Sequence, residues 1–433
     1  MPKKAEDSLM RVERHLIRPS SPWFSMIGEF CHLAKNLYNH GNYLVRNRFI
    51  NNGQWMRYDE LDKALKTDVD YPDYRAMPTA QAAQQVLRLL DKNWKSFFAA
   101  IKDWKEHKEK YLGRPKLPKY KEKNGKFILV LTNQNCRLKG AEVIFPRSFR
   151  GFKAAPEFMK DKESQREFDT FQQVRFIPDG TNIVMEIVYT IKAAPQKEDN
   201  GRYAGIDIGV DNLLTMATNT GMAPLIVNGR VPKSINQFYN KKLACLKSVC
   251  QQMTGHYSSN KIRHFTAKRN RKIDDYMHKA SKLLVEKCAE LEINTIVIGQ
   301  NKEWKQESKL SRRVNQHFVQ LPFARLIQMI EYKARERGIA VILTEESYTS
   351  GTSFLDKEAP VKENYDKTRR IHRGLFRANN GRLINADVNG AFQIMRKVFP
   401  NVSADGIEGV VLRPVVVVAA YPILGLSRAV NEQ

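Results

Sequence analysis

Tyr203-Ala-Gly-Ile-Asp207-Ile-Gly-Val-Asp-Asn-Leu-Leu-Thr215 begins with an otherwise apolar strand that contains one acid, Asp207. The pattern predicts a strand through Ile206, Asp207 and Ile208, a turn at Gly209 and a second strand from Leu213, which together form a β-hairpin. Asp207 is then expected on a buried face, where an isolated carboxylate needs a cation, a metal or a proton to compensate its lost hydration. A structural salt bridge or an outward-facing strand position explains Asp207 equally well, so other acids must decide.

A second acid lies near the other end of the chain, in Asn385-Ala-Asp387-Val-Asn-Gly-Ala. This segment predicts a helix that is capped by Asn385 and has Asp387 in its first turn. The helix macrodipole favours a carboxylate there, so Asp387 is also explained as a good helix start. One acid in a first strand and one at the start of a last helix match the metal-binding corners of a ribonuclease-H-like fold, where two divalent ions flank a scissile phosphate. Apolar residues at helical spacing should lay this helix on a core: Val388, Ala391, Ile394, Met395 and Val398.

Four motifs in this order resemble the split RuvC nuclease of the TnpB family (OrfB type), transposon-encoded RNA-guided nucleases similar to the compact type V CRISPR effectors. The motifs are Gly205-Ile-Asp207-Ile-Gly-Val-Asp-Asn-Leu-Leu-Thr, Thr295-Ile-Val-Ile-Gly-Gln-Asn301, Tyr348-Thr-Ser350 and Asn385-Ala-Asp387-Val-Asn-Gly-Ala.

The resemblance implies a multidomain α+β protein. A small wedge β-barrel is expected from residues 1–20 and 110–195, with a helical recognition lobe, residues 21–109, inserted in it. A ribonuclease-H-like (RuvC) α/β nuclease domain is expected over 196–433, with a helical insertion at 235–291 and a zinc-free loop at 350–380.

The third acid expected from the resemblance is displaced in this sequence. In most TnpB-like proteins a glutamate ends the strand that here ends in Gly299. The next predicted parallel strand runs into Glu345 and Glu346, and neighbouring strands are only ~4.8 Å apart, so a long side chain can reach over a glycine. Strand alternation lets only one of the pair face the site; Glu346 is preferred because it shares a face with Tyr348, and Glu345 is the second choice. A subset of TnpB-like and Fanzor-like proteins carries its glutamate in this relocated place, and this sequence resembles that subset. The alternative is a pair of solvated strand-end charges.

The charge of the chain indicates a polyanionic partner. Across 433 residues, 72 Lys+Arg face 46 Asp+Glu, which gives a formal net charge of +26 and predicts nucleic-acid binding. A merely basic, solvated surface is the alternative. The side chains expected to contact nucleic acid, mainly through backbone phosphates, are Gln84, Gln85, Arg88 and Lys92, then Lys116, Lys119 and Lys121, then Arg263, Lys268, Arg269 and Arg271, and finally Arg369, Arg370 and Arg373.

The cysteines argue against a zinc ribbon and a disulfide framework. Cys31, Cys136, Cys245, Cys250 and Cys288 include no Cys-x-x-Cys pair, which favours a reducing compartment. The two Cys pairs common in the family's zinc-binding segment are missing, so we expect no zinc. No apolar run approaches the ~20 residues of a membrane span, and the N-terminus lacks the apolar core of a signal peptide. We therefore expect a cytoplasmic protein with no membrane partner.

The resemblance implies an RNA-guided DNA endonuclease that acts with a guide RNA and two Mg²⁺ ions held by Asp207, Glu346 and Asp387. A double-stranded DNA target, single-stranded DNA in the nuclease groove, and a monomer or homodimer on one RNA are expected with it. Gly299 keeps one rival open, a nuclease-inactive RNA-guided DNA-binding repressor. A third possibility is a DNA-binding transposition accessory that uses no RNA.

Overall fold

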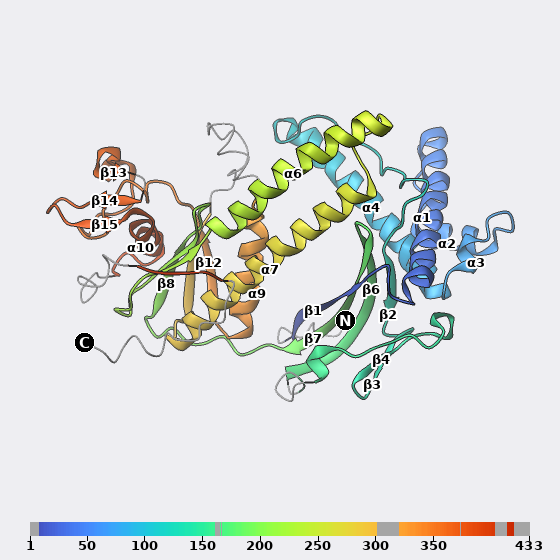
Figure 1. Ribbon diagram of the computed structural model, residues 1–433, viewed down its shortest axis with the longest axis horizontal. Coiled ribbons are helices and arrows are strands. Elements are labelled where there is room, and N and C mark those ends of the chain that lie inside the picture. Colours follow the sequence, from blue (N-terminus) through green and yellow to red (C-terminus); the bar gives the residue numbers. More distant parts are fainter. Residues whose placement is uncertain are drawn as a thin grey trace. The chain divides into compact units, whose positions relative to one another are not determined.

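The computed structural model describes residues 8–160, 165, 167–300, 320–372, 374–402 and 414–419. The chain divides into two compact units, Met1–Lys192 and Ala193–Gln433. Both units combine helices with β-sheets (Figure 1). The mixed α and β content predicted from the sequence is therefore present.

The first unit contains a four-stranded sheet in which the N-terminal strand joins strands much later in the sequence. Its order is β1 (Ser8–Ile17), β7 (Asn182–Lys192), β6 (Phe168–Asp179) and β2 (Leu129–Thr132). A smaller sheet is formed by β3 (Arg137–Lys139), β4 (Glu142–Ile144) and β5 (Lys153–Ala154). Among the described residues no pairing between β1 and β2 closes the larger sheet, so the wedge barrel remains a prediction.

The helices of the first unit lie between β1 and β2 in the sequence. They are α1 (Phe24–Asn52), α2 (Tyr58–Thr67), α3 (Asp73–Ala76) and α4 (Ala80–Glu106). The α1 helix approaches α4 closely at Gly41, where a Cβ atom would lie 3.1 Å from Leu90 Cδ2. Trp94 is fully buried between them and donates its indole N–H to Asn42 Oδ1 at 3.1 Å. The apolar stripe of α4 is therefore core.

The second unit is built on a six-stranded mixed sheet. Its order is β12 (Ala340–Thr344), β11 (Thr295–Gly299), β8 (Tyr203–Asp207), β9 (Asn212–Thr218), β10 (Leu225–Asn228) and β16 (Val415–Val417). The β8, β9 and β10 strands are antiparallel, whereas β11 pairs in parallel with β8 and with β12. The β8–β9 hairpin and the parallel strands β11 and β12 agree with the sequence prediction, and β16 extends the sheet beside β10.

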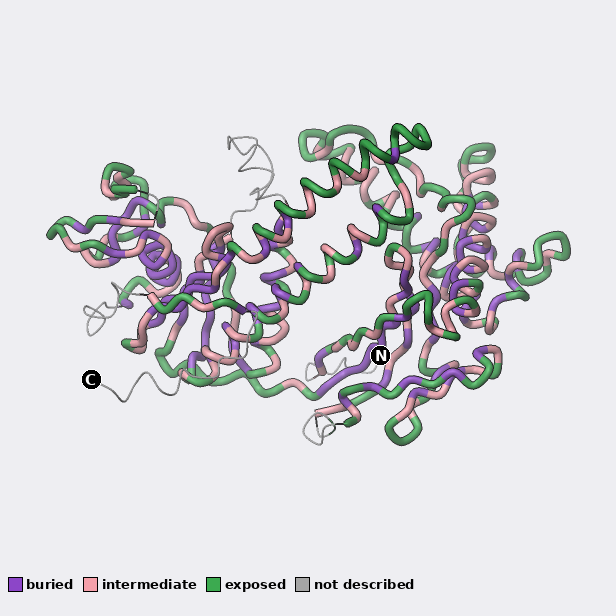
Figure 2. The backbone as a smooth tube through the Cα atoms, viewed as in Figure 1, coloured by how far each residue is buried: buried purple, intermediate pink, exposed green. Residues whose placement is uncertain are grey.

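Helices cover both faces of this sheet. The long helices α6 (Arg230–Thr254) and α7 (Asn260–Glu290) follow β10, and α9 (Phe323–Glu336) precedes β12. Side chains of α7 and α9 share one core cluster with the sheet, and those of α10 (Ala386–Val398) share another. Most of α10 is buried (Figure 2). At Gly205 of β8, a Cβ atom would lie 2.0 Å from the backbone oxygen of Ala391 in α10, so only glycine allows this helix–strand contact.

The segment predicted as a zinc-free loop, 350–380, contains β13 (Arg370–His372) and β14 (Leu375–Arg377), which form a small sheet with β15 (Leu383–Asn385) just after the segment. Its first part is anchored on α10 by buried polar groups. Asn389 Nδ2 donates to the backbone oxygen of Thr352, and Asn389 Oδ1 accepts from Phe354 N. The Phe354 ring stacks on Phe392 with centroids 4.3 Å apart, and the Arg396 guanidinium lies over it. Burial lowers the pKa of Arg396 to about 10.

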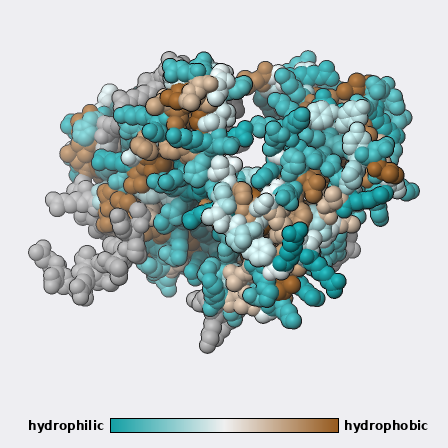
Figure 3. All heavy atoms as spheres, turned by 45° about the vertical axis from the view of Figure 1, so that its right-hand side comes forward, coloured by the Kyte–Doolittle hydropathy of each residue, from teal (hydrophilic) through white to brown (hydrophobic). Residues whose placement is uncertain are grey.

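The surface visible in Figure 3 is mostly hydrophilic, with scattered apolar side chains. Within the described ranges, no helix is both long and apolar enough to cross a bilayer.

Candidate active site

Asp207 is the last residue of β8 and lies beneath the N-terminal part of α10. A Cβ atom on Gly390 of that helix would lie 3.0 Å from Asp207 Oδ2. Burial, followed by the nearby carboxylates of Glu346 and Asp387, raises the pKa of Asp207 well above its ordinary value. The Arg370 guanidinium and the Ile208 backbone N–H act in the opposite direction. The structure therefore brings three acids from distant segments into one electrostatic environment.

Asp387 is oriented by its own helix and by a neighbouring strand. Asn385 caps α10, and its Oδ1 accepts from the backbone N–H of Asp387 at 3.0 Å and of Val388 at 3.1 Å, as the sequence predicts. Asn212 Nδ2, at the start of β9, donates to Asp387 Oδ2 at 2.6 Å. Arg370 Nη2, on β13, lies 3.7 Å from Asp387 Oδ1. Both carboxylate oxygens of Asp387 are thus near positive or N–H groups.

The side chain of Glu346 lies over Gly299. A Cβ atom at Gly299 would be 2.6 Å from Glu346 Cγ, 2.7 Å from Glu346 Oε1 and 2.6 Å from Ile394 Cδ1. Because Gly299 has no side chain, the space beside the end of β11 is open, and the side chain of Glu346 fills it. Glu346 Oε1 is buried, whereas Glu345 is exposed and is not among the charges that shift the Asp207 pKa.

The direction of Glu346 is set by a turn and not by strand alternation. The β12 strand ends at Thr344, before both glutamates, so the alternation argument for Glu346 is wrong. Thr349 donates to the Glu346 backbone oxygen through N at 3.2 Å and through Oγ1 at 2.8 Å. Tyr348 has a φ of 67°, and Lys397 Nζ donates to Ser347 Oγ at 3.1 Å.

The three acids fit a divalent cation in charge and ligand type, but they are not gathered around one point. Carboxylate oxygens are the ligands that Mg²⁺ prefers, and burial together with the charges of Glu346 and Asp387 raises the pKa of Asp207. In the part of the chain that the structure describes, no group of three or more His, Cys, Asp or Glu side chains is arranged to hold a metal ion. Asp387 is instead engaged by Asn212, with Arg370 nearby.

Some of the predicted nucleic-acid contacts are occupied within the protein. Arg269 bonds to Asn236 Oδ1 at 2.7 Å and to the backbone oxygen of Gln320 at 3.0 Å, and burial lowers its pKa. Arg369 Nη1 lies 2.7 Å from each carboxylate oxygen of Glu358. Arg269 and Arg369 are thus engaged in hydrogen bonds and an ion pair within the protein. They could bind nucleic acid only after these contacts are broken.

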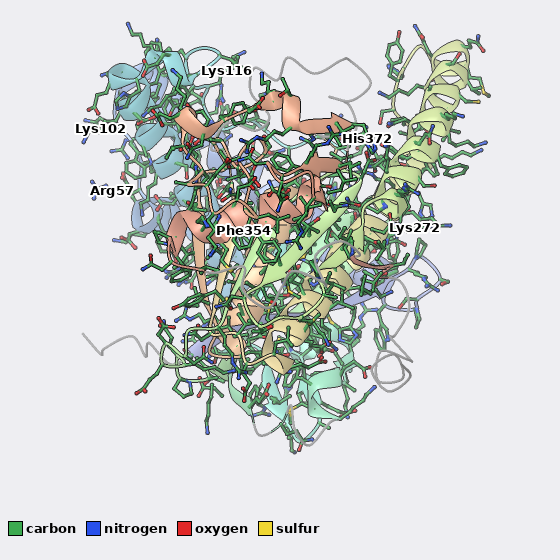
Figure 4. All side chains as sticks on the ribbon, turned by 90° about the vertical axis from the view of Figure 1, so that its left-hand side faces the viewer. Arg57, Lys102, Lys116, Lys272, Phe354 and His372 are labelled. Carbon is green, nitrogen blue, oxygen red and sulfur yellow. The ribbon has the colours of Figure 1, made fainter. Side chains whose placement is uncertain are left out.

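The other predicted contacts differ in exposure. Lys121 Nζ packs over the Tyr38 ring at 4.8 Å, and the Arg88 guanidinium lies over the Tyr58 ring at 4.5 Å. Arg373 lies outside the described residues. Lys116, which is labelled in Figure 4, is exposed. The exposed side chains are Arg88, Lys92, Lys116, Lys119, Arg263, Lys268 and Arg370, and the half-buried ones are Gln84, Gln85, Lys121 and Arg271.

Asn212 and Lys397 are neighbours of the acids that were not predicted from the sequence. Asn212 is part of the quoted hairpin, but only the structure shows its contact with Asp387, which is 175 residues away. Lys397 follows Asp387 on α10, and its pKa is lowered by burial while Glu345 and Glu346 oppose the change. Neither position carries a sequence signal beyond its place in a predicted element.

Two family models match the segments that carry the acids. The OrfB_IS605 family, described as a probable transposase, matches residues 186–305, which include Asp207. The Cas12f1-like TNB domain matches residues 323–394, which include Glu346 and Asp387.

Individual relatives of low sequence identity belong to the same groups of proteins as the two family models. The CRISPR-associated endodeoxyribonuclease Cas12f2 of Micrarchaeota archaeon (strain CG1_02_47_40) is 29% identical over 236 residues, which cover 49% of this chain and only 40% of that protein. The TnpB-like protein ORF457 of Acidianus two-tailed virus is 22% identical over 415 residues, covering 84% of this chain and 81% of the relative. A solved Cas12f1–sgRNA–target DNA complex shares the fold with a TM-score of 0.55, at 15% identity over 85% of this chain and 82% of that chain.

Proposed function

Because this chain is a TnpB-family protein related to the compact type V CRISPR effectors, we propose that it is an RNA-guided DNA endonuclease. In this proposal a guide RNA pairs with the target strand, and the protein reads a short flanking motif. Asp207, Glu346 and Asp387 then serve hydrolysis of the phosphodiester bond by water, which breaks the bond to the 3′-oxygen.

The observation that carries the proposal is the placement of Glu346 over Gly299. It supplies a third carboxylate to the pair formed by Asp207 and Asp387, whose charges already act on one another. These three residues would hold two Mg²⁺ ions. Bound Mg²⁺ would lower the pKa of a water molecule and stabilise the charge on the leaving oxygen.

The chain's own groups have separate tasks around this centre. Asp207 is fixed at the end of β8, Asp387 is held by the N-terminal turn of α10, and Glu346 reaches in from the turn after β12. Arg370 brings a positive charge beside Asp387, where it can attract a phosphate of the substrate. Exposed basic side chains of both units would bind the guide RNA, the double-stranded target and single-stranded DNA, on a monomer or homodimer and without zinc.

The first prediction separates the two glutamates. With the RNA that co-purifies with the protein and a matched DNA target, wild type should cut in Mg²⁺ and not in EDTA. Glu346→Ala should lower the cleavage rate by more than about 100-fold, beyond the effect typical of an outer-shell partner. Glu345→Ala is the matched control, because this neighbour is exposed, and it should retain cutting. Equal losses in both variants would contradict the assignment of Glu346.

The runner-up is a guide-directed DNA-binding protein without nuclease activity. Gly299 in place of the usual glutamate favours it, as does the lack of a gathered metal-binding group among the described residues. Under that reading, wild type binds the matched target in Mg²⁺ without cutting it, and Glu346→Ala leaves binding unchanged.

A further inference from the structure

We propose that Asn212 is a positioning residue that holds the Asp387 carboxylate ready for a divalent cation. The inference rests on the nuclease site proposed above and adds to it a side chain from across the turn of the hairpin that carries Asp207, since Asp207 ends β8 and Asn212 begins β9.

The contact between Asn212 and Asp387 has one chemical sense. An ionised carboxylate can only accept hydrogen bonds, so the NH₂ end of the Asn212 amide must face it. The distance of 2.6 Å from Nδ2 to Oδ2 is that of a short, charge-assisted hydrogen bond. Such a bond restricts the rotation of the Asp387 carboxylate and fixes the direction of its second oxygen.

An asparagine suits this place because its amide donates without carrying a net charge. A lysine would neutralise the acids and compete with a metal cation for Asp387. An aspartate would add a further negative charge beside acids that already raise the pKa of Asp207. The amide orients Asp387 without adding a second positive charge to that of Arg370.

The backbone that carries Asn212 is fixed from two sides. A Cβ atom at Gly209 would lie 2.6 Å from the backbone oxygen of Asn212, and one at Gly229 would lie 2.2 Å from that of Val210. Gly229 N also donates to the Asp211 backbone oxygen at 2.8 Å. The turn before β9 is therefore enclosed by glycines that permit its close approach, and the Asn212 amide starts from a defined position. Groups that orient metal ligands need this kind of support.

The chain provides a matched control at the other end of the same strand. Asn219 directly follows β9, is half-buried like Asn212, and also donates through Nδ2, to the Gly201 backbone oxygen at 2.7 Å. Truncation of Asn219 removes this bond and the one that Asn219 Oδ1 accepts from Tyr203 N at 2.8 Å, and neither bond is made to one of the three acids.

The experiment measures Mn²⁺ binding to the full chain, free of nucleic acid, by isothermal titration. We expect Asn212→Ala to weaken Mn²⁺ binding by about 10- to 100-fold, as loss of an outer-shell partner does, and Asn219→Ala to leave it unchanged. Asn212→Leu keeps the side-chain volume without the donor and should match Asn212→Ala, which separates the hydrogen bond from packing. Unchanged Mn²⁺ affinity in both Asn212 variants, or equal weakening in Asn219→Ala, would overturn the inference.

A double-mutant cycle then tests whether Asn212 acts through Asp387. In the Asp387→Ala background, Asn212→Ala should cause no further loss of Mn²⁺ affinity, because its partner is already absent. Additive losses would overturn the inference. Cleavage by the same variants is measured separately. If the Mn²⁺ affinity of the wild type depends on Asn212 and Asp387 but the wild type does not cut DNA, the nuclease proposal is contradicted and the role of Asn212 is still supported.

Discussion

Gly299 shows how the absence of one side chain determines where another can lie. Its position at the end of β11 would place any Cβ atom inside the volume of Glu346 and against Ile394. A glutamate cannot occupy both this position and the one that reaches over it. The relocated acid and the glycine are therefore one coupled feature.

The second prediction follows from this coupling. Gly299→Ala should destabilise the second unit by about 1–3 kcal/mol, the usual cost of overpacking, and should reduce cleavage by displacing Glu346. Chemical denaturation and cleavage of a matched target measure the two effects. Gly113→Ala is the control, because a Cβ atom there meets nothing within 4 Å. A Gly299→Ala protein that is as stable and as active as wild type would show that Glu346 does not need this space.

The sequence is enough to select the candidate residues, but it does not predict their geometry. The departure at Gly299 and the two candidate glutamates follow from the resemblance, but the reason for preferring Glu346 was wrong, since a turn and not the β12 strand carries it. The contact of Asn212 with Asp387 could not be predicted, because it depends on how α10 packs against the hairpin. Local patterns contain no information on such a long-range distance.

At the scale of elements, α10 connects the core, the site and the segment before it. Its start positions Asp387, Gly390 passes over Asp207, and its buried polar side chains anchor residues 352–358. Changes at its first turn should therefore affect chemistry as well as stability.

The third prediction concerns the Asn385 cap. Asn385→Ala should lower the free energy of unfolding by about 1 kcal/mol, as loss of an N-cap usually does, and should also slow cleavage because Asp387 loses its fixed helical turn. Thermal unfolding and cleavage rate are the readouts.

Ser259→Ala provides the comparison, because Ser259 caps α7 by accepting from Ile262 N at 3.3 Å and lies on a helix without any of the three acids. It should cost similar stability and leave cleavage intact. A similar loss of cleavage in both variants would mean that stability alone explains the effect.

The regular elements were largely predictable, and the small sheet was not. The hairpin of β8 and β9, the parallel strands β11 and β12 and the capped helix α10 each have a clear hydrophobic period or capping residue. The β13–β15 sheet has strands of three residues each, too short for a period to be recognised. It is supported by contacts with distant residues instead.

At the scale of the whole molecule, the resemblance to TnpB proteins is confirmed by the family models and relatives. The net charge of +26 leads to a quantitative expectation for how the affinity for nucleic acid depends on salt. Binding of a basic protein to nucleic acid releases counterions, so its affinity falls as salt rises. Exposed lysines that contact phosphates contribute to this dependence, whereas lysines paired within the protein contribute less.

The fourth prediction uses this difference. The affinity of the chain for its co-purified RNA should fall linearly on a log–log plot against salt, and Lys92→Ala or Lys116→Ala should each reduce the slope by about one. Lys153→Ala should leave the slope unchanged, because Lys153 pairs with Glu142 at 2.9 Å. Filter binding over a range of KCl concentrations measures the slopes. If the Lys92→Ala and Lys116→Ala variants have the same slope as the wild type, Lys92 and Lys116 do not contact the RNA.

The order of the strands also has a consequence during translation. The first strand, β1, cannot pair until β7 has been synthesised, since Ser8 pairs with Lys192, and Asp207 of β8 is covered only after the much later helix α10 has been made. If translation ends before α10 is made, the shortened chain already has most of the lysines and arginines of the sequence but lacks Asp387. If the chain is the proposed nuclease, prematurely terminated products should therefore retain some attraction to nucleic acid but lack one of the three carboxylates that the proposal requires for cleavage.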